Sequence, residues 1–212
     1  MRRPIPTTVV HFTHVSHLTS IVRGGLVADS TAHANGLLEV EVGNVGIKEA
    51  RQRRFVPIAP HGVVADYVPF YFAPRSPMMF AIEKGNVATY VEGCDDLVYL
   101  VTTAERLLES GSPVVFTDRN AVLAIASFAS TIEEAEERID WPLMRARIWR
   151  NTDDDPARVE RRMAECLVHL KVPWNALTEV AAKNSRCATI ARATFANLGV
   201  DTPVNVRPGW YF

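Results

Sequence analysis

Residues 151–174 contain the sequence feature that most limits how this chain can fold, a change from helical to strand periodicity around one glutamate. Asp155 and Pro156 are typical of a helix cap and the first residue of a helix, and they predict a helix start there. From residue 164 to 172 the apolar residues recur with a period of two, which indicates a strand. Glu165 is the carboxylate within this strand.

Glu165 has apolar residues on both sides in sequence, so the strand would carry a carboxylate into a protein interior. Burying such a group costs several kcal/mol unless another group satisfies it or the chemistry uses it. An exposed glutamate at the edge of a sheet would explain the same pattern. The stretch alone leaves a functional and a structural interpretation open.

The overall composition bounds the class of protein. The chain has 212 residues, of which 48% are hydrophobic and 22% charged, and we expect a single domain over residues 1–212. A formal net charge of −1 excludes a basic protein that coats nucleic acid non-specifically, so any nucleic-acid contact requires a local cationic patch. Three widely spaced cysteines predict neither a disulfide framework nor a zinc site. With no segment typical of a membrane span or signal peptide, we expect a cytoplasmic protein.

The N-terminal part predicts a strand over residues 8–13, with His11 and Thr13 on one face. A short helix should follow and end at Gly24-Gly25, where the backbone could approach a ligand closely. No glycine-rich dinucleotide fingerprint or phosphate loop is present. His11 by itself is typical of a core or surface histidine, so its role stays open here.

Metal binding has little support in this region. His14 and His17 lie three residues apart, but the sequence shows no third ligand for them. We therefore expect no metal ion.

A long small and polar stretch over residues 30–46 predicts a loop of the kind that often forms a lid. Residues 47–54 then predict a short helix with Arg51, Arg53 and Arg54 in its C-terminal half. Cations are favoured at that end of any helix, so a solvated helix end is one explanation. A patch that contacts phosphates is the other.

The remaining pattern predicts short strands mixed with helices that do not strictly alternate. This favours an α+β fold with a mixed or antiparallel sheet. Strands are expected at 67–73, where Pro69 indicates an edge or a bulge, and at 97–102, 114–117, 177–182, 204–206 and 210–212, with helices after Ser76-Pro77, at a capping box formed by residues 102–105, and at 185–198.

Several blocks, in this order along the chain, resemble the DarT family of bacterial toxins that ADP-ribosylate DNA. They are VVHFTHVSHLTSIVRGGLVADS, VGIKEARQRR, DYVPFYFAPRSPMMFAI, FTDRN, RRMAECLV and RPGWYF. The resemblance implies an ADP-ribosyltransferase-like split β-sheet, two small sheets packed as a clamp with short flanking helices and NAD in the cleft. It also implies a cognate antitoxin with an ADP-ribose-removing macrodomain as a partner.

The resemblance assigns roles to individual residues as well. It implies that His11 binds NAD, that Arg51 lies in the catalytic centre and that Glu165 is the catalytic glutamate. Val10 departs from an expected aromatic residue, and Asn120 stands where some relatives carry histidine. The full candidate set for NAD is His11, Thr13, Ser20, Gly25, Leu26 and Tyr71, and for DNA it is Arg53, Arg54, Arg75, Asn120 and Arg147.

The chemistry of NAD cleavage is consistent with one glutamate. Glycosidases use two carboxylates because one must protonate the leaving oxygen. Nicotinamide leaves as a neutral molecule from a cationic ring, so one carboxylate that faces the developing cation suffices. For a thymine acceptor, the ring N–H proton must be removed or the resulting anion stabilised, for which Glu165 and Arg51 are the candidates. Single-stranded DNA would leave the reacting base edge accessible.

Two other classes remain open. An ADP-ribosyltransferase that modifies protein or RNA would use the same cleft chemistry. A nucleic-acid-binding module without catalysis would bind DNA but not turn over NAD.

Overall fold

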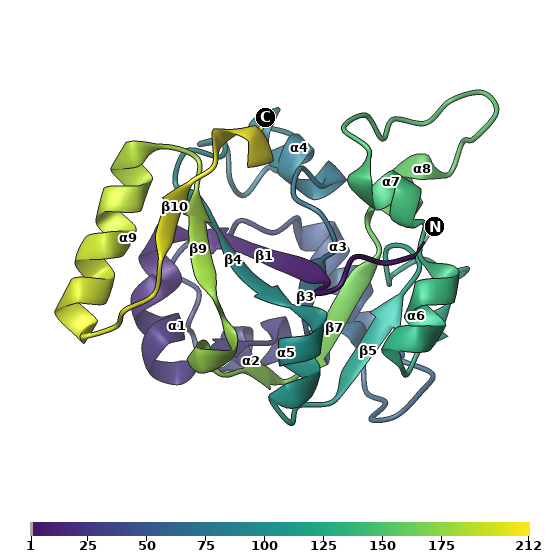
Figure 1. Ribbon diagram of the computed structural model, residues 1–212, viewed down its shortest axis with the longest axis horizontal. Helices are drawn as coiled ribbons and strands as arrows, with labels where there is room; N and C mark the ends of the chain where they lie inside the picture. The colour runs from purple at the N-terminus through teal and green to yellow at the C-terminus, as the bar shows by residue number, and fades with distance from the viewer. Residues whose placement is uncertain (1) are drawn as a thin grey trace.

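A computed structural model describes residues 2–212, and its centre is a sheet with the strand order β10-β9-β4-β1-β3-β7-β5-β6 (Figure 1). The chain order of these strands differs strongly from their spatial order, so residues far apart in sequence become neighbours. A second, two-stranded sheet pairs β2 with β8. The strand bounds are β1 Thr8–His14, β2 Leu26–Val27, β3 Tyr67–Tyr71, β4 Leu97–Thr103, β5 Val114–Thr117, β6 Phe128–Ala129, β7 Glu165–His169, β8 Lys171–Val172, β9 Glu179–Ala182 and β10 Val204–Val206.

Short helices flank the sheet, with α1 and α9 at one end and α6, α7 and α8 at the other (Figure 1). None of the helices within residues 2–212 has the length and apolar character needed to cross a bilayer. The α-helix bounds are α1 Leu18–Gly24, α2 Asp29–Ala34, α3 Val45–Arg53, α4 Pro77–Glu83, α5 Ala104–Glu109, α6 Ile132–Arg138, α7 Trp141–Arg145, α8 Arg158–Arg162 and α9 Ser185–Leu198. Single 3-10 turns are η1 Val15–His17, η2 Val64–Asp66, η3 Trp174–Ala176 and η4 Pro208–Trp210.

The pairing between neighbouring strands is weakest in the middle of the large sheet, between β1 and β3. Strand β1 pairs with β4 along its whole length, from Thr8 opposite Thr103 to His14 opposite Leu97. It meets β3 at one Cα pair, Val10 opposite Tyr71. The sheet therefore divides into two halves that diverge on either side of this pair, which confirms the predicted α+β fold with a split sheet.

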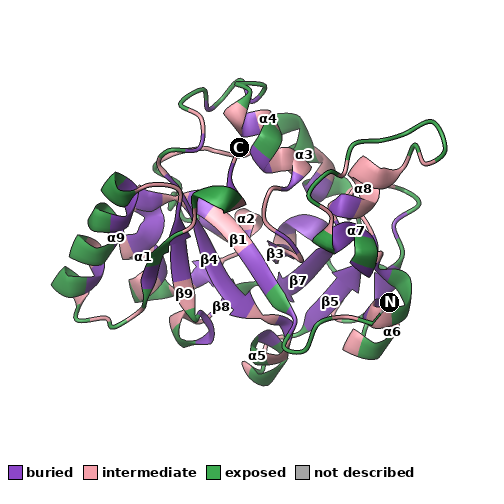
Figure 2. Ribbon diagram, turned by 45° about the horizontal axis from the view of Figure 1, so that its top comes forward, coloured by how far each residue is buried: buried purple, intermediate pink, exposed green. Residues whose placement is uncertain are grey.

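The core lies on both faces of this sheet. Strands β4 and β7 are buried along nearly their whole length, whereas β1 includes partly exposed residues (Figure 2). Residues 97–101 of β4 are all buried, which explains why their sequence is continuously apolar rather than alternating. Caps follow the predicted chemistry at α4, where the Ser76 side chain accepts from the Met79 N–H and Pro77 begins the helix. Gly199 ends α9 in the left-handed conformation.

Two predicted elements near the glutamate are wrong in detail. The strand over residues 164–172 is interrupted, because Leu170 has a φ of 61° and separates β7 from β8. Helix α8 begins at Arg158 and not after Pro156. The Asp155 carboxylate accepts instead from Arg161 at 2.7 Å, so it is not free to cap the helix.

Three further predictions need correction. The stretch 30–46 is not wholly a loop, because α2 occupies residues up to Ala34 and α3 begins at Val45. The cap of α5 is Thr103, since the Glu105 side chain binds the Thr7 N–H instead of completing a capping box. Residues 210–212 form no strand, because Trp210 is the last residue of the 3-10 turn η4 and residues 211–212 have no regular structure.

Candidate functional site

Arg51 and Glu165 form a buried ion pair. Arg51 comes from the C-terminal half of α3 and Glu165 begins β7, and Nη1 of the arginine lies 2.8 Å from Oε1 of the glutamate. Arg51 is 8% exposed and Glu165 1%, so little solvent screens the pair. The interpretation of Glu165 as an exposed edge residue is therefore wrong.

Backbone groups complete the surroundings of Glu165. Its second carboxylate oxygen, Oε2, accepts the N–H of Ala121 at 2.9 Å. The backbone N–H of Glu165 donates to Oγ1 of Thr117 at 3.2 Å. The backbone at Ala121 thus lies directly against the carboxylate, and each carboxylate oxygen retains a further acceptor site.

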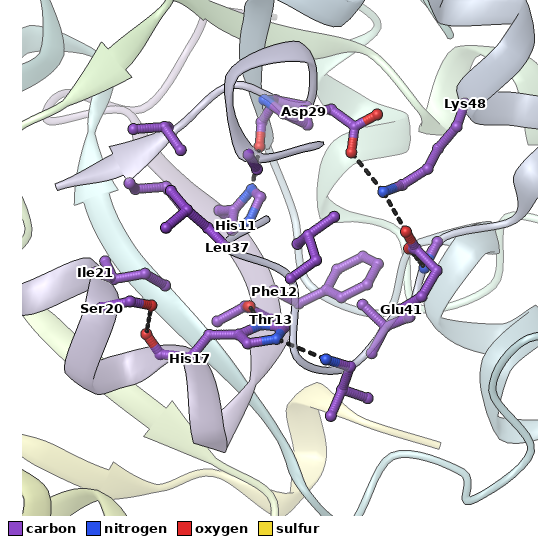
Figure 3. Close-up of a pocket in the computed structure, with 18 of the residues that line it drawn as sticks. His11, Phe12, Thr13, His17, Ser20, Ile21, Asp29, Leu37, Glu41 and Lys48 are labelled. Atoms are coloured by element: carbon purple, nitrogen blue, oxygen red, sulfur yellow. Dashed lines mark hydrogen bonds and ion pairs between the residues drawn. The ribbon is translucent and has the colours of Figure 1, made fainter. Parts of the chain in front are cut away.

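A cavity of about 290 Å³ leads to the arginine of this pair. Its wall includes Arg51 and Tyr71 and extends along β1, α1 and the segment 35–44 (Figure 3). Glu165 is not itself in the wall. All six residues that the sequence nominated for NAD line the cavity, namely His11, Thr13, Ser20, Gly25, Leu26 and Tyr71.

His11 faces the cavity as a neutral ring. Its Nδ1 lies 2.8 Å from the carbonyl oxygen of Pro69, which can only accept, so Nδ1 carries the proton and Nε2 is an acceptor. Burial lowers the pKa of His11 to about 4, and the charges of Arg51 and His17 act in the same direction. His11 can therefore bind a hydroxyl through Nε2 at neutral pH.

Tyr71 connects the cavity to the ion pair. It lies opposite Glu165 in the register of β3 and β7. Burial, together with the negative charge of Glu165, raises the pKa of Tyr71 well above its usual range, so the phenol stays neutral. Its ring stacks on Phe12, with 6.4 Å between centroids and 11° between planes. The cavity wall thus includes two nearly parallel aromatic rings.

Gly25 has a structural reason for being glycine. Its φ is +82°, and a Cβ there would lie 2.8 Å from the Val172 carbonyl oxygen and 2.6 Å from a side-chain carbon of Lys171. Close packing against β8 therefore excludes a side chain, whereas Gly24 has open space around it. The packing of the chain thus explains Gly25, but not Gly24, before any ligand is considered.

Two groups that the sequence did not nominate hold the segment 35–44 over the cavity. His17 accepts the Val40 N–H at Nε2, 3.1 Å away, so its Nδ1 carries the proton and donates to Thr13 Oγ1 at 2.9 Å. Lys48 pairs with Asp29 of α2 at 2.5 Å and with Glu41 of the segment at 2.6 Å (Figure 3).

No sequence pattern indicated these contacts. His17 and Val40 lie 23 residues apart, and Lys48 pairs with residues of two separate elements.

The cations nominated for DNA fall into two groups. Arg53 and Arg147 are exposed. Arg54 instead donates to the carbonyls of Ala121 and Ala124, and it lies over the Phe128 ring.

Arg75 lies over the Phe212 ring at 4.1 Å and donates to the Tyr211 carbonyl. Asn120 accepts the Val122 N–H, and its backbone lies beside the Glu165 carboxylate through the neighbouring Ala121. Within residues 2–212 there is no cluster of side chains suited to a metal ion.

A split sheet with a buried arginine–glutamate pair at the end of a cavity lined by the first strand defines this protein as an ADP-ribosyltransferase. Residues 10–212 match the family model "ssDNA thymidine ADP-ribosyltransferase, DarT". The chain belongs to the DarT family, which confirms the resemblance seen in the sequence.

Individual relatives agree with this assignment. The DNA ADP-ribosyl transferase of Thermus sp. (strain 2.9) is 38% identical over 184 residues, 86% of this chain and 84% of the relative. The solved structure of Thermus sp. 2.9 DarT in complex with ADP-ribosylated ssDNA matches with a TM-score of 0.92 and 33% identity, covering 100% of this chain and 99% of that one. The same enzyme in complex with NAD+ matches with a TM-score of 0.88 and 32% identity, covering 99% of this chain and 100% of that one.

Proposed function

We propose that this chain transfers ADP-ribose from NAD⁺ to a thymine base of single-stranded DNA, with Arg51 and Glu165 as its catalytic residues. The observation that carries the assignment of residues is the buried pair at 2.8 Å beside the end of the cavity. Removing two charges from water costs free energy that their attraction often does not recover, so stabilisation of the fold does not by itself explain a buried ion pair. A catalytic role does explain it.

The wall of the cavity supports the placement of NAD⁺. When bound, NAD⁺ supplies a ribose that is activated by a cationic leaving group. The acceptor Nε2 of His11 would bind a ribose hydroxyl, and the backbone near Thr13 would hold the carboxamide. The face of Tyr71, which stays neutral, would lie against the nicotinamide ring. Ser20, Gly25 and Leu26 would line the part of the site nearer α1.

Glu165 would act in two steps of the reaction, the loss of nicotinamide and the attack by thymine. Its negative charge would stabilise the positive charge that develops on the ribose, because the surroundings exclude water and screen it little. It would then accept the proton released from the ring nitrogen of thymine. The hydrogen bonds from Arg51 and Ala121 fix the orientation of the carboxylate for both tasks.

Arg51 would stabilise the anionic thymine while the new bond forms. Its guanidinium is part of the cavity wall and always charged, and it can donate to a base carbonyl as well as to Glu165. Asn120 and its loop would contact the acceptor base, since the neighbouring Ala121 binds the Glu165 carboxylate through Oε2, the oxygen that Arg51 does not bind. Exposed Arg53 and Arg147 would contact phosphates. Arg54, which holds the loop at Ala121, and Arg75, which lies over Phe212, would add to the positive potential that attracts DNA.

Mass spectrometry of oligonucleotides incubated with protein and NAD⁺ tests this function. We expect one added ADP-ribose on single strands that contain thymine. Thymine-free strands and fully paired duplexes are the controls, and they should stay unmodified. Modification of protein or RNA with no product on any oligonucleotide would favour the alternative class of ADP-ribosyltransferase. DNA binding without loss of NAD⁺ would indicate a silent binding module.

The wider setting is also a proposal. We propose that residues 1–212 form one catalytic domain, which the continuous eight-stranded sheet supports. We further propose that the protein is a toxin of the cytoplasm with a macrodomain antitoxin that removes ADP-ribose from DNA. The three cysteines, all free and buried, are compatible with a reducing compartment.

A further inference from the structure

Three aromatic side chains from distant parts of the chain meet near the end of α4. Phe80 of α4, Trp149 of the segment after α7 and Phe212 pack edge to face around one another. The ring centroids of Phe80 lie 6.1 Å from Trp149 and 5.0 Å from Phe212, and those of Trp149 and Phe212 lie 6.3 Å apart. Phe80 is 38% exposed, and the other two rings are partly exposed. We call these three residues the aromatic platform.

Cations surround the aromatic platform. The Arg75 guanidinium lies 4.1 Å from the centre of the Phe212 ring, and the Lys84 ammonium lies 5.6 Å from that of Phe80. Arg147 and Arg150, on either side of Trp149, are exposed, and no carboxylate in residues 2–212 pairs with either. The patch thus combines partly exposed rings with positive charges that no carboxylate in the described part of the chain pairs with.

A buried arginine holds this patch in place. Arg162 of α8, which is 5% exposed, donates from Nη1 to the carbonyls of Leu143, Met144 and Ala146 at 2.6, 2.9 and 3.1 Å. Its Nη2 donates to the Pro74 carbonyl at 2.8 Å. Arg162 therefore connects the start of the segment that carries Trp149 to Pro74, the residue before Arg75. Arg162 itself lies three residues before Glu165 in sequence.

The segment is fastened at a second point. Arg158 donates to the carbonyls of Ile148 and Arg150 at 3.2 and 3.1 Å. The backbone on both sides of Trp149 is thus fixed, so its ring is presented in one orientation at little entropic cost to a ligand.

Helix α4 places the aromatic platform next to the reaction cavity. Met78 of α4 lines the cavity, while Phe80, two residues later, points to another side of the same helix. The width of an α-helix with its side chains is about 10 Å, so cavity and platform are separated by roughly the length of one or two nucleotides. A strand whose thymine reacts at the cavity could reach the platform with its neighbours.

We propose that the aromatic platform, with Arg147 and Arg150, is a second binding site for single-stranded DNA that holds nucleotides flanking the reacting thymine. This inference rests on the proposed function. Stacking rings interleaved with unpaired cations suit unpaired bases and their phosphates, whereas a duplex offers no free base faces. Asp153 and Asp154 lie further along the same segment. They would repel phosphates and so limit how far the DNA strand extends on that side.

The experiment compares binding and turnover on oligonucleotides of two lengths. Fluorescence anisotropy and single-turnover modification are measured with a strand of three nucleotides and one of twelve, each with one central thymine. The variants are Phe80→Ala, Arg147→Gln and Arg150→Gln. Arg186→Gln on α9, at the far end of the molecule, is the control for loss of one surface charge (Figure 1).

We expect Phe80→Ala to weaken binding of the longer strand by about fivefold or more and to leave the short strand unchanged. Arg147→Gln and Arg150→Gln should each reduce the salt dependence of binding, by a slope of about 0.7 per lost phosphate contact. Arg186→Gln should change neither quantity. Thermal melting of each variant verifies that the fold is retained.

Equal losses on both strands, or no loss on the longer one, would overturn the proposal. If the wild type modifies neither strand, the proposed function fails, and the anisotropy data alone then decide whether the platform binds single strands. A preference for duplex over single strands of equal length would assign the patch to another kind of contact. Strands extended on only one side of the thymine show which flank occupies it.

Discussion

Nη1 of Arg51 lies 2.8 Å from Oε1 of Glu165, although 114 residues separate them in sequence. The contact joins α3, which borders the cavity, to β7, which lies between β3 and β5 in the sheet. The cavity reaches the arginine and not the glutamate, so a substrate at its end meets the guanidinium first. The proposed mechanism therefore makes separate predictions for the two residues.

Glu165→Gln should slow transfer to DNA by about 10² to 10⁴-fold, because it removes the charge that faces the ribose and the acceptor for the thymine proton. The amide keeps the size of the side chain, so NAD⁺ affinity should change little. Single-turnover mass spectrometry and calorimetry measure the two quantities. Transfer within tenfold of the wild-type rate would show that the glutamate is not catalytic.

Glu165→Ala should also destabilise the fold, and more than the glutamine variant, whose amide oxygen can still accept the hydrogen bond from Arg51. It leaves the buried Arg51 guanidinium without its carboxylate, which costs about 3–5 kcal/mol for pairs of this kind. The double variant Arg51→Ala/Glu165→Ala should lose less stability than the sum of the two single variants. Urea unfolding of all four proteins gives this comparison, and simple additivity would contradict the strong coupling we infer.

Arg51→Ala should reduce turnover far more than it reduces DNA affinity, because we assign the guanidinium to the anionic thymine and not to a phosphate. Arg53→Ala is the matched control, since Arg53 lies on the same helix and is exposed. That variant should weaken DNA binding modestly and flatten its salt dependence. Parallel losses of affinity and turnover in Arg51→Ala would make this residue one more phosphate contact.

His11→Asn should weaken NAD⁺ binding more than DNA binding, and it should also change how stability depends on pH. The folded pKa of His11, about 4, lies below its ordinary value of 6.5. The neutral ring therefore contributes stability that is complete above about pH 6.5 and is lost as the pH falls towards 4. Chemical denaturation at pH 7.5 and 5 should show a smaller loss for the variant than for the wild type.

His17 faces the same region, and its pKa is lowered by burial and by the charge of His14. Protonation of His17 contributes to the pH dependence of the wild type and of His11→Asn alike. Only the difference between the two proteins therefore reports on His11. An identical loss of stability in the two proteins would contradict the assignment, as would unchanged NAD⁺ affinity by calorimetry.

Lys48→Met should weaken NAD⁺ binding severalfold by releasing the segment 35–44 from α2 and α3. Lys48 is the cation between Asp29 and Glu41, and both carboxylates would repel each other without it. Lys183→Met is a close control, since Lys183 also pairs with two carboxylates, Glu83 and Asp95, and does not line the cavity. Calorimetry with NAD⁺ on both variants gives the result, and equal effects would exclude a role for the segment.

The sequence alone determined the features that depend on neighbours along the chain. The cap at Ser76-Pro77, the glycine stop at Gly199 and the apolar run from Leu97 were all predictable, because dihedral preferences and periodicity act within a few residues. The same local pattern placed Glu165 on a strand. It could not decide whether that glutamate was exposed or buried, since burial depends on what packs against the strand.

Tertiary structure decided everything that required a distant partner. Arg51 and Glu165 meet because β7 lies between β3 and β5, and Asp155 lost its predicted capping role because it pairs with Arg161. Arg162 is held by backbone carbonyls, which every residue has and no sequence pattern marks. Contacts of this kind arise only when the packed core fixes both partners, and for that reason the side chains of the site could be nominated from sequence but their geometry could not.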